Sequence, residues 1–486
     1  MGANTTALIG TVVPSTGNPL NGLFLSGDGI AETTYTWPSL RVAPRVGAVY
    51  DISGDQSMIV RGGAGLYFDR PSGNSIYPQV QNPPTIRNST VRYTDLQSLS
   101  TGLSINAPPA LNVFEYAGDL PSSVQWSGGL QMTLPWASAI DVTYVGQHSY
   151  NTLEGVDINS VDFGSAYAAQ NQDASLSSTT PGANALPADQ LRAFRGYSSI
   201  TQQWGRGWRT FHSLQLSFNR RFRDGLSFGV NDTIVLSDHQ STNARLEHSP
   251  DGSYRIRADQ AQADELLGTF VANRHVLKGN FIWDLPDIHA GTGTRRTIGW
   301  LANDWQLSGV WTASTPTAYQ VGVSYQGGAT GNGNQNITGS PTYGGRVRIV
   351  GDPGSGCSSD PYRQFNTAAF LGPLPGSVGL ESGMDYLRGC FNSTIDLAIA
   401  RTIRVGGSRR VQFRLDMFNA FNQARITNRN NTMNLVSPLD STIANLPFDS
   451  AGNLITTRSQ PKNAGFGVAT AYQAPRTMQM QIRFSF

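Results

Sequence analysis

Apolar and polar side chains alternate along the last ten residues of the chain, 477–486. The apolar members are Met478, Met480, Ile482, Phe484 and Phe486, and polar residues lie between them. Successive side chains of a β-strand point to opposite faces, so the pattern predicts a strand with one apolar and one polar face. Its length matches the roughly nine to eleven residues that a tilted strand needs to cross a bilayer. A strand of a soluble β-sandwich would alternate in the same way.

Five pairs of similar segments precede this strand. They cover 45–53 and 57–68, 126–134 and 140–144, 214–219 and 226–230, 274–285 and 305–313, and 392–405 and 410–419. Most pairs are joined by a few turn-forming residues, such as Gly54-Asp55-Gln56 and Arg223-Asp224-Gly225. Short joins of this composition are typical of β-hairpins. The chain is therefore predicted to contain about eleven strands.

The connections between these segments alternate between short and long. Long stretches run over about 69–121, 148–208, 238–273, 315–390 and 421–475. Outer-membrane barrels have short periplasmic turns and long extracellular loops, whereas a sandwich has no reason to sort its loops by end. If the terminal strand finishes in the periplasm, every short turn is periplasmic and every long loop extracellular. The predicted fold is an all-β, antiparallel transmembrane β-barrel over 45–486, preceded by an irregular segment, 1–44, that has room for one short strand at 6–13.

Composition is consistent with this prediction but does not decide it. The chain has 486 residues, 53 of them Gly, with 14% charged and 10% aromatic side chains. These values suit membrane strands with aromatic girdles, and they also suit a soluble all-β protein. No run of about 18 apolar residues is present, so a membrane-spanning chain of this sequence would have to be a barrel. A net charge of +2 without a Lys/Arg block argues against a nucleic-acid partner.

The cysteines and the N-terminus bear on the cellular compartment. Cys357 and Cys390 are the only cysteines, and an even count predicts one disulfide in an oxidising compartment, with two unrelated free thiols as the alternative. The first residues lack the basic and apolar regions of a signal peptide. A surface protein needs such a signal. We therefore expect that the signal was removed or that the front of the protein is missing.

Several stretches resemble the barrel of TonB-dependent receptors, specifically the Oar-like group that often carries a carboxypeptidase-regulatory-like domain. They are APRVG at 43–47, VRGGAGLYFDR at 60–70, LQLSFNRRF at 214–222, WQLSG at 305–309 and FRLDMFNAFN at 413–422. The terminal Phe486 resembles the last residue of bacterial outer-membrane barrels. This likeness implies that Phe486 is an assembly signal read by the outer-membrane assembly machinery.

The resemblance implies active import of a bulky nutrient across the bacterial outer membrane. Such receptors have a barrel of about 22 strands and a plug domain, and an inner-membrane complex energises them through an N-terminal coupling box. Neither plug nor coupling box is present in this sequence, so we expect the C-terminal half of such a barrel. The energising complex would then act through the missing N-terminal part. A structural or adhesive surface protein acting through its long loops is the alternative, and a soluble β-sandwich enzyme or lectin is a third.

No catalytic, cofactor or metal site is predicted. No Ser-His-Asp or Cys-His pairing can be proposed, and the six histidines show no ligand spacing on a common face. The segment 157–162 has Ca²⁺-like oxygens but lacks the Gly and final Glu of an EF-hand, which favours a solvated loop. The glycines at 62–65 are not followed by a helix, and 291–296 lacks the ending of a P-loop. We predict a small-residue membrane strand and a periplasmic turn, respectively.

The polar positions of the last two predicted hairpin segments are the best candidates for a lumen surface. They are Gln412, Arg414, Asp416, Gln479, Gln481 and Arg483. Since the apolar residues between them would face lipid, these six are predicted to face the lumen. We expect a hydrogen-bonded and ion-paired wall facing a plug, with direct contact to the transported ligand as the alternative. The sequence does not identify that ligand.

Overall fold

The computed structural model describes most of the chain. The long described stretches are 40–82, 108–116, 118–240, 273–287, 301–326, 332–379, 381–383 and 385–486. Shorter pieces lie at 25–27, 29–33, 36, 90–92, 97, 103–105, 246–248, 254–256 and 299. The strand predicted at 6–13 and the turn predicted at 291–296 lie outside the described residues.

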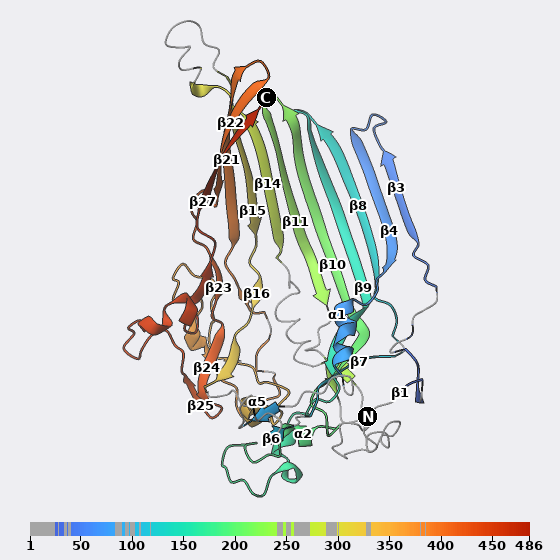
Figure 1. Cartoon of the computed structure of the whole chain (residues 1–486), viewed down its shortest axis with the longest axis vertical. Helices are drawn as coiled ribbons and strands as arrows, with labels where there is room; N and C mark the ends of the chain where they lie inside the picture. The colour runs from blue at the N-terminus through green and yellow to red at the C-terminus, as the bar shows by residue number, and fades with distance from the viewer. Residues whose placement is uncertain are drawn as a thin grey trace.

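One twelve-stranded sheet dominates the molecule (Figure 1). Eleven strands are antiparallel neighbours in chain order: β3 (Arg45–Asp51), β4 (Met58–Phe68), β8 (Ser122–Leu134), β9 (Ser138–Asp157), β10 (Ile200–Arg223), β11 (Leu226–Gln240), β14 (His275–Asp284), β15 (Trp305–Ser314), β21 (Asn392–Gly406), β22 (Arg409–Phe418) and β27 (Thr477–Ser485). The twelfth, β7 (Leu111–Phe114), pairs in parallel with β10. The predicted strands and their order are confirmed.

The short connections gather at one end of the sheet and the long ones at the other (Figure 1). We call these the turn end, which includes Ser485 and the turn 407–408, and the loop end, which includes His275 and Thr477. β3 and β27 are the two edge strands and are not paired with each other. Because eleven antiparallel neighbours alternate in direction, β3 and β27 run the same way, both from the loop end to the turn end.

Cross-strand register separates the two faces of the sheet. Val411 is opposite Phe484, Phe413 opposite Ile482, Leu415 opposite Met480 and Met417 opposite Met478. These residues define the apolar face, on which Met480 and Phe484 are 74% and 69% exposed. The residues between them define the polar face. Such large exposed side chains are favourable only against an apolar surrounding, which is what the bilayer supplies.

At the turn end, backbone amides stabilise the β3–β4 turn by donating hydrogen bonds to an aspartate carboxylate. In the β3–β4 turn the Asp51 carboxylate accepts hydrogen bonds from the amides of Ser53, Gly54 and Gln56. Gly54 and Gln56 both have positive φ, which fits a tight turn. Hydrogen bonds from the Ser53 and Ser57 side chains lower the pKa of Asp55 in the same turn to about 2.

Two strands are longer than the sequence predicts. The stretch 148–208 was predicted as loop, whereas β9 continues to Asp157 and β10 begins at Ile200, paired as Thr201 with Asp157. That boundary prediction is wrong. Beyond the lipid band both faces of a hairpin contact water and loops, so alternation is not required, and a bulge between Gly205 and Gly207 interrupts it further.

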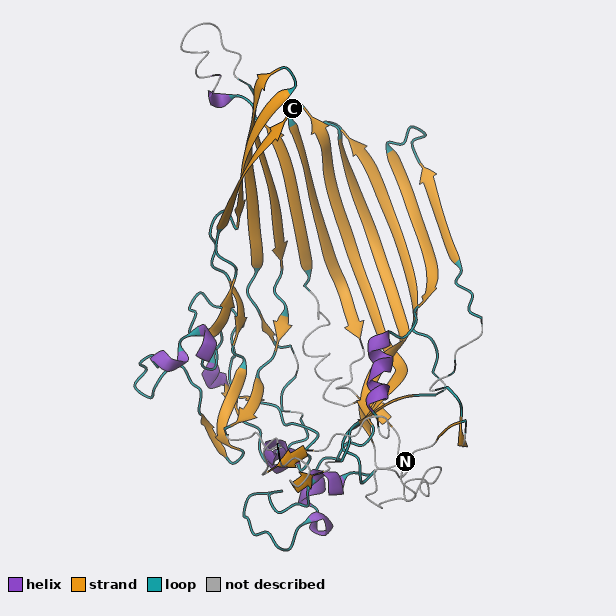
Figure 2. Cartoon of the chain, in the orientation of Figure 1, coloured by secondary structure: helices purple, strands orange, loops and turns teal. Residues whose placement is uncertain are grey.

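The long loops and the segment before β3 contain secondary structure of their own (Figure 2). Their short strands are β1 (Leu25–Ser26), β2 (Gly29–Ile30), β5 (Thr90–Arg92), β6 (Leu103–Ile105), β12 (Leu246–His248), β13 (Tyr254–Ile256), β16 (Ala318–Tyr319), β17 (Gly322–Tyr325), β18 (Arg348–Ile349), β19 (Phe370–Leu371), β20 (Leu387–Arg388), β23 (Ile426–Arg429), β24 (Thr432–Ser437), β25 (Asp440–Ile443) and β26 (Ala469–Tyr472). Their helical turns are α1 (Gly73–Ile76), η2 (Tyr77–Gln81), η3 (Ser165–Tyr167), η4 (Ala169–Asn171), α2 (Ala188–Leu191), α5 (Asn332–Thr338), η6 (Thr367–Ala369), η7 (Thr456–Arg458) and η8 (Pro461–Asn463). Among the described helices, none has the length and apolarity to cross a membrane.

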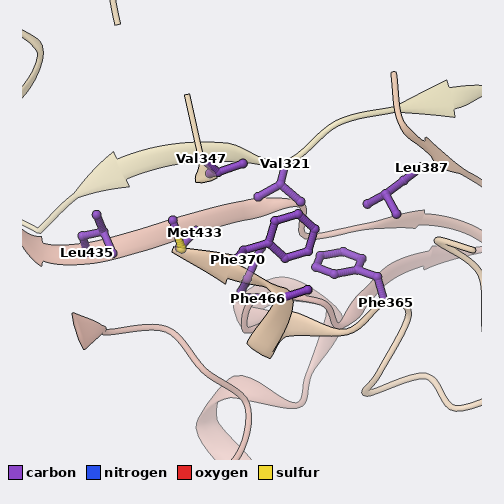
Figure 3. Packing of buried hydrophobic residues seen from close by; sticks show 9 residues of the cluster. Val321, Val347, Phe365, Phe370, Leu387, Met433, Leu435 and Phe466 are labelled. Carbon is purple, nitrogen blue, oxygen red and sulfur yellow. The ribbon is translucent and has the colours of Figure 1, made fainter. Parts of the chain in front are cut away.

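The largest apolar core lies in these loops and not in the sheet (Figure 3). We call it the loop core; its members are Val321, Val347, Phe365, Ala369, Phe370, Leu387, Met433, Leu435 and Phe466. They come from the β15–β21 loop and the β22–β27 loop. A sheet with lipid on one face and polar groups on the other has no dry interior, so buried apolar packing must form elsewhere.

Candidate functional site

The six predicted lumen residues lie together on the polar face. Gln412 is opposite Arg483, Arg414 opposite Gln481 and Asp416 opposite Gln479. Within this set Arg414 donates from Nε to Asp416 Oδ1 at 2.8 Å. A separate bond joins Gln412 Nε2 to Thr402 Oγ1 of β21 at 3.4 Å. The register therefore brings all six onto one polar surface, and three of them take part in these two side-chain bonds.

A groove of about 420 Å³ lies on the polar face farther along the sheet. Its polar lining comes from five strands: Arg61, Gln131, Asp141, Gln215, Ser217, Asn219, Asn231 and Thr233. Arg61 Nη2 contacts Asp141 Oδ2 at 2.6 Å, and Thr143 Oγ1 donates to the other oxygen of Asp141 at 2.7 Å. Charge-assisted bonds of this kind fix both side chains. The groove can therefore hold a polar ligand or chain segment against a preset pattern of donors and acceptors.

Sequence reasoning did not select the groove residues as a site. The sequence does indicate that these residues lie on the polar face, because Gln131, Asp141 and Gln215 occupy the polar positions of alternating segments. What alternation cannot supply is the spatial order of strands along the sheet. That order places Arg61 beside Asp141, which is 80 residues away in the chain.

The disulfide between Cys357 and Cys390 is present, with Cα atoms 5.1 Å apart, as the even cysteine count predicts. It closes a 33-residue separation within the β15–β21 loop. Next to it the Arg429 guanidinium lies over the Tyr319 ring at 4.7 Å, and Arg429 is only 9% exposed. The bridge therefore links the beginning of β21 to the loop core.

Three tyrosines show that the loop core is shielded from water. Tyr319, Tyr325 and Tyr386 all pack against it. Burial raises the pKa of each of these phenols to about 12. The Tyr319 hydroxyl donates to Gly356 O at 2.6 Å, and Tyr386 accepts from the Val321 amide at 3.0 Å. These two bonds hold the rings of Tyr319 and Tyr386 in place at the loop end.

A second interface joins two loops across the loop end. The β9–β10 loop contacts α5 and the residues after it, although β11 and β14 lie between these loops in the sheet. Gln335 and Asn336 donate to Gly182 O and Pro181 O at 2.8 and 2.7 Å. Phe163 stacks on Tyr343 with ring centroids 4.8 Å apart. The interface is closely packed, because its buried members include Val161, Ile337, Thr338 and Ser340, all at most 1% exposed.

The FNAFN stretch of the resemblance has a structural role at the loop end of β22. Asn419, with φ 48°, donates from Nδ2 to Gln423 O and Ala474 O at 3.0 and 2.8 Å. The backbone amide of Asn419 donates to Asp396 Oδ1 of β21 at 2.8 Å. The Asn422 side chain accepts from the Arg476 amide at 3.0 Å. The stretch therefore joins the ends of three neighbouring strands.

The segment 157–162 does not form a solvated loop. Asp157 accepts from the amides of Asn159 and Ile200, and the Asn159 side chain donates to Ser198 O at 2.7 Å. Asn159 is fully buried. Its amide satisfies loop carbonyls that water could not reach, which is why the prediction of a solvated loop is wrong. In the described part of the chain no group of three or more His, Cys, Asp or Glu side chains could hold a metal ion.

Four of the six histidines share the apolar face near the loop end. Tyr144 hydroxyl and His212 Nδ1 lie 2.6 Å apart, and His148 Nδ1 lies 2.8 Å from Thr210 Oγ1. His239 is opposite Thr210, and His275 contacts Asp232 at 3.0 Å. This grouping could not be predicted from the sequence, because the four residues come from four different strands. Trp126 of β8 lies on the same face and packs edge-on against His212, with ring centroids 5.8 Å apart. The glycines at 62–65 lie within β4, as predicted.

Comparisons with known proteins agree with this architecture. A family model described as an outer membrane beta barrel domain matches residues 3–479. No curated protein matches the chain. Solved structures with a similar fold include the outer membrane transporter YddB from Escherichia coli, with 10% identity and TM-score 0.44, covering 91% of this chain and 40% of that one.

Two further solved structures are similar in the same range. A variant of the ferric enterobactin receptor PfeA from Pseudomonas aeruginosa has 12% identity and TM-score 0.40, covering 90% of this chain and 39% of the receptor. The siderophore receptor PirA from Acinetobacter baumannii has 12% identity and TM-score 0.38, covering 80% and 38%. The chain spans about two fifths of the length of these proteins.

Proposed function

Because the chain belongs to the family of outer membrane beta barrel domains, we propose that it forms the barrel part of a TonB-dependent transporter that imports a bulky nutrient. Its location is the bacterial outer membrane. The resemblance of the stretches at 43–47, 60–70 and 413–422 supports the Oar-like group. The proposed partners are outer-membrane lipid, the assembly machinery that reads Phe486, and an inner-membrane energising complex.

The observation that carries the proposal is the polar face and what lies above it. Polar groups line one face of the sheet, and the folded loops with their own core lie at its loop end. In the proposed barrel this face is the inner wall and the loop end is extracellular. Such a wall suits a hydrated ligand or a polar segment and would be unfavourable against lipid. The arrangement supports transport without catalytic chemistry.

We further propose that the barrel is completed by strands beyond the eleven in this meander. An open edge in lipid leaves unpaired N–H and C=O groups at several kcal/mol each, roughly. β3 and β27 run in the same direction, so an odd number of added strands is needed for antiparallel closure. Bacterial single-chain barrels have even strand numbers, which supports this requirement.

Uptake by intact cells tests the transport proposal. The gene, with its upstream coding sequence, would be expressed in a host lacking its own receptors for a ferric siderophore, cobalamin and an oligosaccharide. Uptake of one of these solutes that a protonophore abolishes is the expected result. Uptake that persists with the protonophore would identify a passive pore. No uptake of any of them, with the protein present at the surface, would favour the adhesive alternative.

That alternative has one observation in its favour, namely that the loops share a core of their own and that a disulfide closes one of them. A surface protein that acts through its loops needs such rigidity. Removal of the β22–β27 loop, 421–475, should separate the two functions. It should abolish cell attachment if the loops act as an adhesin, and it should change ligand uptake without changing attachment if the protein is a transporter.

A further inference from the structure

Three arginines lie close together on the polar face at the turn end. Arg404 of β21 is directly opposite Arg410 of β22. Arg410 is opposite Ser485 and Gln412 is opposite Arg483, which makes Arg483 of β27 a diagonal neighbour of Arg410. Directly opposite Cβ atoms are about 4.5 to 5.5 Å apart and diagonal ones roughly 7 to 8 Å. Three guanidinium groups therefore share one small area of three adjacent strands.

These arginines differ from the other charged groups of the same face. Arg61 is paired with Asp141 at 2.6 Å and Arg414 with Asp416 at 2.8 Å. In the described part of the chain Arg404, Arg410 and Arg483 form no ion pair, and all three are exposed. Like charges placed directly opposite each other destabilise a strand pair. The cluster therefore carries a like-charge cost that no acidic side chain among the described residues offsets.

The position of the three arginines limits which anions could reach them and offset their repulsion. Arg404, Arg410 and Arg483 follow the alternation of Gln412 and Arg414, so they lie on the polar face. In the barrel of the proposed function, on which this inference rests, that face lines the lumen and points away from lipid. Arg409, the neighbour of Arg410, is opposite Gly406 and lies on the other face. Lipid phosphates are accessible to Arg409 at the rim, whereas the cluster is accessible to solutes in the lumen.

We propose that Arg404, Arg410 and Arg483 form a binding site for a soluble multivalent oxyanion, one carrying several phosphate or carboxylate groups, at the periplasmic end of the lumen. Guanidinium groups present planar pairs of donors that match carboxylate and phosphate oxygens. Rings of arginine create the anion preference of several pores, and a low-dielectric wall focuses their field. The site is separate from the extracellular loops, and it does not depend on which nutrient the barrel imports.

Calorimetric titration of the full chain in detergent at low ionic strength tests the site, with pyrophosphate as the probe. The variant Arg404→Gln/Arg410→Gln/Arg483→Gln should bind pyrophosphate at least about tenfold more weakly than the unchanged protein. Arg409→Gln removes one charge from the same hairpin on the opposite face and should bind like the unchanged protein. Added salt should weaken binding to the unchanged protein, because exposed charges are screened.

A charge-conserving variant separates binding from folding. Arg404→Lys/Arg410→Lys/Arg483→Lys keeps the positive charge and should retain part of the affinity that the glutamine variant loses. The proposal would be overturned if the unchanged protein and the triple glutamine variant bound pyrophosphate equally well. It would also be overturned if Arg409→Gln lost as much affinity as the triple variant, because binding would then follow net charge alone.

A second arm distinguishes a soluble anion from a lipid headgroup. The chain would be reconstituted in phosphatidylcholine bilayers with and without phosphatidylglycerol. Pyrophosphate binding should be the same in both, because the arginines face away from the lipid. Loss of binding when the anionic lipid is present would assign the cluster to lipid phosphates and overturn the soluble-anion site.

Discussion

Arg61 of β4 and Asp141 of β9 form an ion pair across the strand that separates them, with Nη2 and Oδ2 2.6 Å apart. The intervening residue is Gly129 of β8, which is opposite both Arg61 and Thr143. A Cβ on Gly129 would collide with the Thr143 hydroxyl and lie 3.2 Å from Val142 O. The missing side chain therefore leaves room for the Thr143 hydroxyl, which donates to the same Asp141 carboxylate that Arg61 contacts.

Gly129→Ala should accordingly lower the free energy of unfolding by about 1 to 3 kcal/mol, the usual cost of overpacking. Gly128→Ala is the matched control, since no atom lies within 4 Å of a Cβ at Gly128 on the apolar face. Urea unfolding in detergent measures both. Equal stability of the two variants would mean that the Gly129 contact does not constrain the wall.

The face assignment of β27 predicts a large difference between adjacent residues. Ile482→Arg places a charge on the apolar face and should cost about 2 to 4 kcal/mol if the residue lies near the bilayer midplane. Gln481→Arg changes the polar face, where Asp416 already pairs with the opposite Arg414, and it should be tolerated. Folding yield and unfolding free energy in lipid vesicles report the difference. Equal tolerance at both positions would remove the basis for assigning the faces.

The disulfide should stabilise the loops and leave the sheet unchanged. By chain entropy, a closed loop of 33 residues is worth roughly 3 to 4 kcal/mol, and Cys357→Ser/Cys390→Ser should lose up to that amount. Limited proteolysis should then cut within the β15–β21 loop at lower urea concentrations than in the oxidised protein. Unchanged protease resistance after both substitutions would show that the loop core holds the loop without the bridge.

High pH should unfold the loop core before it damages the sheet. The pKa of Tyr319, Tyr325 and Tyr386 is raised to about 12 by burial, against an ordinary value near 10. The stabilisation from these neutral phenols is complete below pH 10 and is lost as the pH rises towards 12. Absorbance of phenolate should therefore show three tyrosines that ionise late, together with loss of the loop core.

Tyr325→Phe is the control for that titration. The Tyr325 hydroxyl is buried and has no hydrogen-bond partner among the described residues, so its removal should leave stability the same or slightly higher. One late-ionising group should disappear from the titration. If all phenols of the unchanged protein ionised together near pH 10, the loop core would be open to water.

Asn419 should be among the most sensitive positions of the FNAFN stretch. Asn419→Ala removes the buried bonds to Gln423 and Ala474 and puts alanine at a φ of 48°, so we expect a loss of about 2 to 4 kcal/mol. Asn419→Gly keeps the backbone conformation without strain and isolates the hydrogen-bond contribution. Thermal unfolding of both variants measures the two contributions. If the glycine variant were as stable as the unchanged protein, the hydrogen bonds of the Asn419 side chain would contribute nothing to the free energy of unfolding.

The strands of the sheet, its two faces and the sorting of its connections are all predictable from the amino-acid pattern alone. The reason is the bilayer, which requires every membrane strand to be apolar at alternate positions, as at Val411, Phe413 and Leu415 on β22. That rule is local, so it can be read from a single segment. The disulfide was also predictable, because two cysteines allow only one pairing.

Contacts between groups that are distant in the chain become visible only in the folded protein. Val321 and Phe466 share the loop core from two different loops, and Arg61 reaches Asp141 across β8. The continuation of β9 and β10 beyond the membrane band likewise carried no signal, since water on both faces removes the need for alternation. Contacts of this kind depend on the folded positions of whole loops and strands, and no periodic pattern along the chain encodes them.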